Sequence, residues 1–103
     1  MSKTILVPVD FSEASDKALD YAVDLAKQLD GRIVVMHAFE IPMVGFPDGT
    51  LVATAEIASR ILNASQKALE DAVIQRKDAG IPMTTRLCQA DPRDAIVSLA
   101  KEL

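Results

Sequence analysis

The sequence is poor in the features that disulfide frameworks, secretion signals and membrane spans require. It contains a single cysteine, Cys88, so no disulfide can form within the chain. No apolar run approaches the roughly 18 residues of a membrane-spanning helix. The first ten residues show no apolar signal region with a small-residue cleavage site. We therefore expect a cytoplasmic protein without a membrane partner.

Positive charge is also scarce. Eleven Lys and Arg residues stand against fifteen Asp and Glu residues, which gives a formal net charge of −4 at pH 7. Proteins that bind a nucleic-acid backbone carry a basic patch, so we expect no nucleic-acid partner. A hydrophobic content of 50% indicates a globular chain, and 103 residues suit one domain.

The hydrophobic pattern alternates between two periods. Three runs rich in apolar and β-branched residues predict strands, at residues 4–9, 32–39 and 83–90. Between and after them, apolar residues recur at spacings of three and four, which predicts helices. These helices span residues 12–29, a stretch of roughly 28 residues from Asp48 or Thr50 to Gly80, and residues 92–103. The alternation predicts an α/β fold around a parallel sheet.

Several residues mark where these elements begin and end. Pro8 cannot donate a ladder hydrogen bond, so we expect it at the end of the first strand. Ser12 and Asp91 are good N-cap residues, and Pro92 suits the first position of the last helix. Gly31 suits the left-handed position after the first helix.

The segment 41–50 contains two prolines and two glycines within the run that begins at Glu40, and we expect a loop there. Four of its residues are apolar, which is unusual for a loop: Ile41, Met43, Val44 and Phe46. They either fold back as a lid over a binding crevice, touch a partner, or pack on the following helix.

Asp10 is the main candidate for chemistry. Open α/β sheets bind ligands at the carboxyl ends of their strands, and Asp10 follows the first strand directly. It contacts a ligand, or it caps the following helix or stabilises the turn before it, and the ligand role is compatible with these structural roles. His37 and Cys88 lie inside expected strands without partners at metal-ligand spacing, so we expect packing roles and no metal site. The sequence shows no paired catalytic groups, and we expect no catalytic residues.

Three stretches together resemble the universal stress protein family. They are "ILVPVDFSEAS" at residues 5–15, "IVVMHAFE" at residues 33–40 and "GIPMTTRLCQADPRDAIVSLAKEL" at residues 80–103. The long second helix after an irregular loop agrees with them. The resemblance covers essentially the whole chain in order.

This resemblance implies a fold and a binding site. The family fold is a doubly wound, Rossmann-like parallel sheet of strand order 3-2-1-4-5, and some members bind ATP at the carboxyl ends of strands 1 and 4. By the resemblance, Pro8 and Val9 would flank the adenine, and the backbone of Ala38 would read its edge. Asp10 would contact the ribose or a phosphate-bound metal.

The sequence departs from the family pattern at its end. The family's strand ending in Met-Gly and its segment G-x-x-G-x9-G-[S/T], which holds the phosphates, are not found among these 103 residues. We therefore expect residues 1–103 to form one universal-stress-protein-like domain that is incomplete at its C-terminus, with only strands 1–3. The strand at residues 4–9 would then be an edge that pairs with further residues or with a second copy.

The function implied by the resemblance is that of a cytoplasmic stress-response regulator. It would bind ATP or a related adenine nucleotide, with or without magnesium, as a homodimer, and show at most slow ATP hydrolysis. The alternative is a dimeric interaction protein of the same family that binds no nucleotide.

Overall fold

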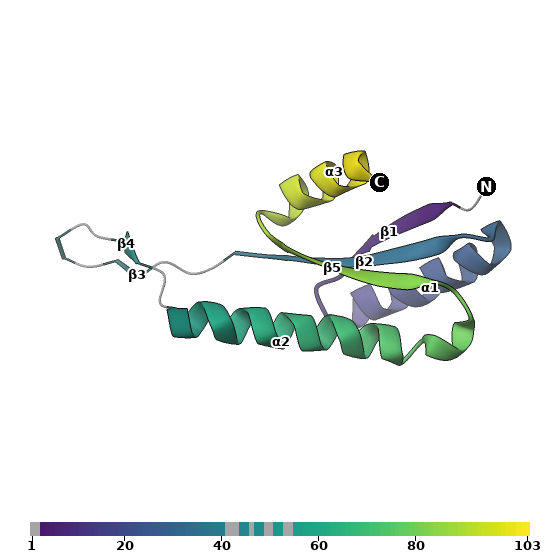
Figure 1. Cartoon of the computed structure of the whole chain (residues 1–103), viewed down its shortest axis with the longest axis horizontal. Coiled ribbons are helices and arrows are strands. Elements are labelled where there is room, and N and C mark those ends of the chain that lie inside the picture. The colour runs from purple at the N-terminus through teal and green to yellow at the C-terminus, as the bar shows by residue number, and fades with distance from the viewer. Residues whose placement is uncertain (1–2, 41–43, 46, 49–50, 53–54) are drawn as a thin grey trace.

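A central parallel sheet organises the chain (Figure 1). The computed structural model describes residues 3–40, 44–45, 47–48, 51–52 and 55–103. The elements in chain order are β1 (Thr4–Pro8), α1 (Glu13–Leu29), β2 (Arg32–Phe39), β3 (Val44–Gly45), β4 (Leu51–Val52), α2 (Ala55–Ile74), a 3₁₀ helix η1 (Lys77–Ala79), β5 (Met83–Gln89) and α3 (Pro92–Glu102).

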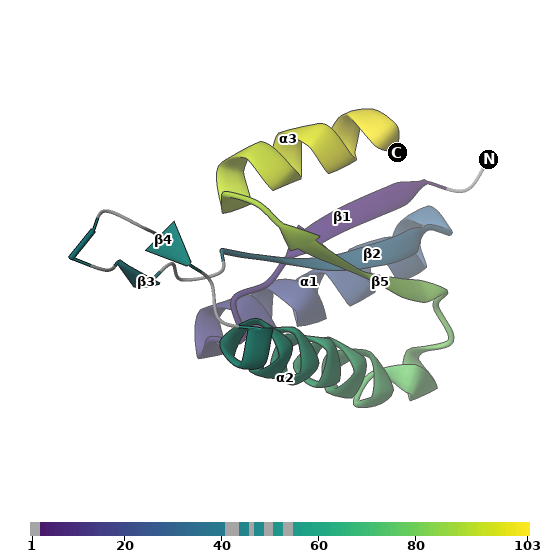
Figure 2. The ribbon, with the colours of Figure 1, turned by 60° about the vertical axis from the view of Figure 1, so that its left-hand side comes forward.

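The three main strands lie in the order β1-β2-β5, and both pairs are parallel. In the register, Val7 pairs with Val35 and Ala38 pairs with Cys88. The predicted α/β fold and the predicted order of the first three strands are both confirmed. Helices α1 and α2 cover one face of the sheet and α3 covers the other (Figure 2), which is the doubly wound arrangement.

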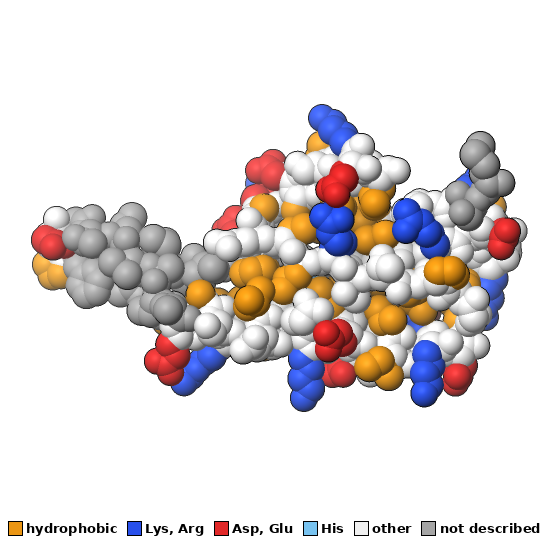
Figure 3. Space-filling view, in the orientation of Figure 1, with side chains coloured by type: hydrophobic (Ala, Val, Ile, Leu, Met, Phe, Trp, Pro, Cys, Tyr) orange, Lys and Arg blue, Asp and Glu red, His pale blue; other side chains and the backbone are white. Residues whose placement is uncertain are grey.

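Strand β2 forms the centre of the core because both of its faces are covered. Ile33 and Val35 pack with residues of α1 and α2, whereas Val34 and Met36 pack against α3. This division follows from the alternation of side chains along a strand. Strand β5 alternates between half-buried and exposed side chains over most of its length, which fits the alternating pattern of its sequence. Hydrophobic side chains are visible in the band between β5 and α2 (Figure 3).

The start of α1 follows the prediction, but its end does not. The Ser12 hydroxyl accepts the backbone N–H of Ser15, as expected of an N-cap. At the other end, Asp30 and not Gly31 takes the left-handed conformation, with φ 52°. A Cβ on Gly31 would lie 2.8 Å from the backbone oxygen of Lys3. Glycine is therefore required there for a close approach of two backbones.

Helix α2 is shorter than predicted. It begins at Ala55, well after Asp48, and ends at Ile74, after which the chain continues in turns and η1. The other predicted cap, Thr50, lies outside the described residues. Gly80 ends this region in the left-handed conformation with φ 72°. This conformation explains why a glycine stands at position 80, but it does not explain why α2 ends earlier. Among the described helices, none has the length and apolar character that crossing a bilayer requires.

The segment predicted as a loop carries one strand of a short antiparallel pair, whose second strand lies just after it. Strand β3 pairs with β4 through Val44–Val52 and Gly45–Leu51. Such pairing satisfies backbone groups that a glycine- and proline-rich sequence would otherwise leave to water. Three of the apolar residues proposed for a lid, Ile41, Met43 and Phe46, lie outside the described residues, as does the side chain of Val44.

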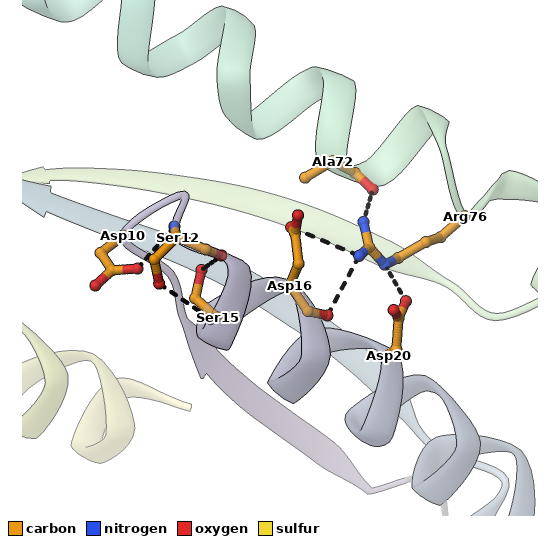
Figure 4. A network of polar contacts seen from close by, with 7 residues as sticks. All are labelled: Asp10, Ser12, Ser15, Asp16, Asp20, Ala72 and Arg76. Carbon is orange, nitrogen blue, oxygen red and sulfur yellow. Dashed lines mark hydrogen bonds and ion pairs between the residues drawn. The ribbon is translucent and has the colours of Figure 1, made fainter.

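A polar clamp joins α1 to the region after α2 (Figure 4). The Arg76 guanidinium donates to the carboxylate of Asp20 at 2.9 Å and to the backbone oxygen of Ala72 at 2.9 Å. It also lies 3.7 Å from the carboxylate of Asp16. The Arg76 side chain is only 11% exposed, so its charge depends on these partners. We call this set the Arg76 clamp.

Candidate functional site

A cavity of about 380 Å³ opens at the carboxyl ends of β1 and β2. Its size falls within the range of roughly 300–1,000 Å³ that small-molecule sites occupy. The starts of α1 and α3 form its other walls, with the N-cap residue Ser12 and Pro92 among the residues there. This is the edge of an open α/β sheet at which ligands bind.

The four residues suggested by the resemblance, Pro8, Val9, Asp10 and Ala38, all line this one cavity. Parallel pairing brings them together, because Pro8 lies opposite Met36 in the register and the Val9 N–H donates to the Met36 oxygen at 2.8 Å. Val9 is buried, and the small side chain of Ala38 is half-buried. The cavity therefore combines a mainly apolar wall with one carboxylate.

Asp10 lies exposed at the mouth of the cavity. Its Oδ1 accepts the backbone N–H of Ser12 at 3.0 Å (Figure 4). Hydrogen bonding from the Ser12 side chain, and then from the Ser12 backbone, lowers the pKa of Asp10. The carboxylate is therefore ionised at neutral pH. Because a carboxylate offers about four acceptor positions, it stabilises this turn and still has capacity for a ligand.

The first turn of α1 uses its own hydrogen-bonding groups. The Ser12 hydroxyl accepts the Ser15 N–H at 3.2 Å, and the Ser15 hydroxyl donates to the Ser12 backbone oxygen at 3.2 Å. The N–H of Asp16 also donates to the Ser12 oxygen, at 3.0 Å. These bonds fix the wall of the cavity beside Asp10.

Two further residues contribute to this region, Phe11 and His37, and the sequence pattern predicted neither of them there. Phe11 adopts a left-handed conformation with φ 64°, which is uncommon for a side chain other than glycine. Its ring lies 4.6 Å from that of His37, and His37 Nδ1 lies 2.8 Å from the Val9 backbone oxygen. His37 is half-buried, in line with the packing role expected of it, and it also lines the cavity. The signal that could have found it is its position beside Ala38.

Asp91 caps α3, as its sequence predicted, by accepting the N–H of Arg93 at 2.9 Å. The structure forms no cluster of three or more potential metal-ligating side chains in the part of the chain that it describes. Every Lys and Arg of the sequence is among the described residues, and none of them lines the cavity. Asp10 would supply one carboxylate oxygen to a magnesium ion whose other partners were water and ligand oxygens, which is how Mg²⁺ commonly binds with nucleotides.

The sequence of this chain matches a known protein family. The model of the universal stress protein family matches residues 1–103. A universal stress protein of Methanocaldococcus jannaschii is 26% identical over 102 residues, and one of Bacillus subtilis is 29% identical over 108 residues. The alignments cover 97% and 99% of this chain, which spans 58% and 73% of the length of these relatives.

Solved structures show the same fold. A universal stress protein family member from Burkholderia pseudomallei has a TM-score of 0.80 at 24% identity, covering 97% of this chain and 74% of that one. A universal stress protein in complex with cAMP has a TM-score of 0.70 at 24% identity, covering 98% and 65%. A family member from Arabidopsis thaliana with AMP bound has a TM-score of 0.64 at 15% identity, covering 97% and 69%.

Proposed function

The chain belongs to the universal stress protein family, and from this premise we propose that it binds an adenine nucleotide in the cavity at the carboxyl ends of β1 and β2. The proposed role is that of a cytoplasmic stress-response regulator that acts by binding and not by catalysis. The nucleotide proposed is ATP or a relative of it.

The observation that carries this proposal is the convergence of Pro8, Val9, Asp10 and Ala38 on one cavity. Two solved structures of the same fold hold adenine nucleotides, one cAMP and the other AMP. These two proteins are 24% and 15% identical to this chain, so they support only the point that this fold can hold an adenine nucleotide. A mainly apolar cavity with a few polar groups is the usual setting for a small-molecule ligand.

Each residue has a proposed task. Val9 and Pro8 would lie against the adenine, and the backbone of Ala38 would read its polar edge. Asp10 would accept a hydrogen bond from a ribose hydroxyl, because its carboxylate is ionised and has acceptor positions left. Magnesium, where present, would arrive on the phosphates and reduce their repulsion from Asp10.

The test is a thermal-unfolding and calorimetric titration with ATP, AMP and cAMP, with GTP as the comparison base. At a ligand concentration a hundred times the dissociation constant, binding should stabilise the folded chain by about 2.7 kcal/mol. Asp10→Ala should weaken binding, whereas Asp24→Ala, an exposed carboxylate in the middle of α1, should leave it unchanged.

Absence of a shift with all three adenine nucleotides at millimolar concentration would contradict the proposal. It would favour the alternative, a dimeric interaction protein of this family that binds no nucleotide. If binding occurs and Asp10→Ala does not alter it, only the role of Asp10 is wrong.

A further inference from the structure

We infer that His37 is a positioning residue for Asp10: from β2, it fixes the turn of residues 9–12 and so sets where the Asp10 carboxylate stands in the cavity. The consequence for ligand affinity rests on the proposed function. The positioning itself is a property of the protein without ligand.

The turn that carries Asp10 adopts a conformation that needs external support. Phe11 has a φ of 64°, and its side chain gives it no intrinsic preference for that region. Residues held in such conformations persist when the surrounding structure imposes them, and they concentrate at functional sites. The turn therefore requires contacts from outside its own four residues.

His37 supplies contacts on both sides of Asp10. Its Nδ1 lies 2.8 Å from the backbone oxygen of Val9, the residue before Asp10. Its ring lies 4.6 Å from the ring of Phe11, the residue after Asp10, at an interplanar angle of 43°. One imidazole on β2 thus holds both neighbours of the carboxylate.

The first of these contacts also fixes the proton on the imidazole. A carbonyl oxygen can only accept, so Nδ1 must carry the hydrogen that it donates to Val9. The hydrogen bond survives in both the neutral and the charged imidazole, because Nδ1 is protonated in each. The positioning contact is therefore insensitive to the protonation of His37.

Strand β2 holds His37 in a fixed position. His37 follows Met36, which is 1% exposed and whose backbone oxygen accepts the Val9 N–H at 2.8 Å. Strand β2 therefore holds both the N–H and the oxygen of Val9, and the Ser12 N–H closes the turn onto Asp10 Oδ1. Without the His37 contact, one of these restraints on residue 9 is lost, and so is the contact to Phe11.

A pair of variants separates the two contacts. His37→Phe keeps an aromatic ring against Phe11 but removes the donor to the Val9 oxygen. His37→Asn places an amide nitrogen near the position of Nδ1 and removes the ring. Val73→Ala shortens a half-buried side chain on α2. It serves as a control that lowers stability without removing a contact to the turn.

The first readout needs no ligand. The pKa of Asp10, followed by NMR of its carboxyl carbon, is lowered because Ser12 bonds to it in the fixed turn. We expect His37→Phe to raise that pKa toward its ordinary value and His37→Asn to preserve it, with no change in Val73→Ala. The charged residues at the start of α1 and of α3, Glu13, Asp16, Asp91 and Arg93, are the same in all variants. Both His37 variants lack the imidazole, so any effect of its charge on Asp10 is common to the two, and the difference between them reports the positioning.

The second readout is affinity for AMP by calorimetry. We expect His37→Phe to weaken binding about tenfold, since a small misplacement of a binding group is enough for such a loss. His37→Asn should stay within about threefold of the original chain, which corresponds to one hydrogen bond retained. Val73→Ala should bind AMP with unchanged affinity while unfolding at a lower temperature.

An unchanged Asp10 pKa in folded His37→Phe would overturn the inference. If His37→Phe does not fold, the ¹⁵N spectrum of the imidazole in the original chain decides: a hydrogen on Nε2 in place of Nδ1 at neutral pH would overturn it. If the original chain binds no AMP, ATP or cAMP, the proposed function fails, while the pKa readout still decides the positioning role.

Discussion

At the residue scale, Ser12 connects the helix start to the candidate site. Its hydroxyl accepts the Ser15 N–H and thereby caps α1, while its own N–H donates to the Asp10 carboxylate. The same residue therefore sets both the helix boundary and the charge state of the acid at the cavity mouth. Local hydrogen bonding lowers the pKa of Asp10 and outweighs the opposite effect of burial, because the group is exposed.

Ser12→Ala should destabilise the chain by about 1 kcal/mol at neutral pH, the usual cost of a lost N-cap. It should also raise the pKa of Asp10. A pKa that is lower in the folded state than in the unfolded state stabilises the folded chain at pH values above the unfolded-state pKa. This stabilisation is lost as the pH falls through the folded-state pKa. The part of the stability difference between Ser12→Ala and the original chain that comes from Asp10 should therefore vanish in acid. Urea unfolding from pH 7 to pH 2 tests this, with the exposed Ser59→Ala as control.

Gly31 and Gly80, two described glycines near helix ends, are required for different physical reasons. Substitution by asparagine should therefore affect stability differently at the two positions. Gly80 has φ 72° with open space where a Cβ would stand, so Gly80→Asn should be tolerated better than Gly80→Ala. At Gly31 any Cβ meets the Lys3 oxygen, so both substitutions should cost about 1–3 kcal/mol. Thermal unfolding of the four variants gives the comparison, and a mild Gly31→Ala would contradict it.

At the element scale, the Arg76 clamp fixes α1 relative to the end of α2. The α1 helix carries Ser15 into the cavity wall, and Arg76, just after α2, holds that helix through Asp16 and Asp20. The Arg76 side chain is nearly buried, whereas the Asp20 side chain is 66% exposed, so solvent screens part of the attraction. The remaining bonds to backbone oxygens make the clamp more than a surface ion pair.

Arg76→Ala should therefore lower the free energy of unfolding by about 1–2 kcal/mol, as expected when a hydrogen-bonded charged group is removed. The matched control is Arg60→Ala, which removes an exposed pair with Glu56 one helical turn away. That change should cost below about 0.5 kcal/mol. Urea unfolding measures both. Equal effects of the two substitutions would show that the clamp is no stronger than a surface pair.

At the scale of the whole molecule, β1 is an outer strand of the sheet. In the part of the chain that the structure describes, it pairs with β2 on one side and with no strand on the other. A groove of about 320 Å³ lies between this strand and α3, lined by Thr4, Leu6, Ala100 and Leu103. Unpaired strand edges next to apolar surface favour pairing with another chain.

We predict that the 103-residue chain self-associates through this edge. Light scattering should give a mass that rises with concentration toward that of a dimer. Thr4→Lys should weaken association, because a lysine on an edge strand disfavours pairing. Thr84→Lys on β5, the other outer strand, is the matched control. A constant monomer mass would contradict the prediction, and a loss of association only in Thr84→Lys would place the interface at β5.

The sequence by itself determined the features that depend on neighbours a few residues apart. The runs at β1, β2 and β5, the caps at Ser12 and Asp91, and a carboxylate at the end of the first strand were all predicted. Periodicity and capping are local, since a side chain bonds to a backbone group two or three positions away. Four of the cavity-lining residues were predicted as well, through the family resemblance.

Only the tertiary structure decided the contacts between segments distant in the chain. His37 meets Val9 across 28 positions, Arg76 meets Asp20 across 56, and Gly31 is required because Lys3 passes close to it. No local pattern encodes these approaches, because they depend on how strands register and how helices pack on the sheet. For this reason the sequence predicted where Asp10 lies along the chain, whereas the fold decided what holds it in place.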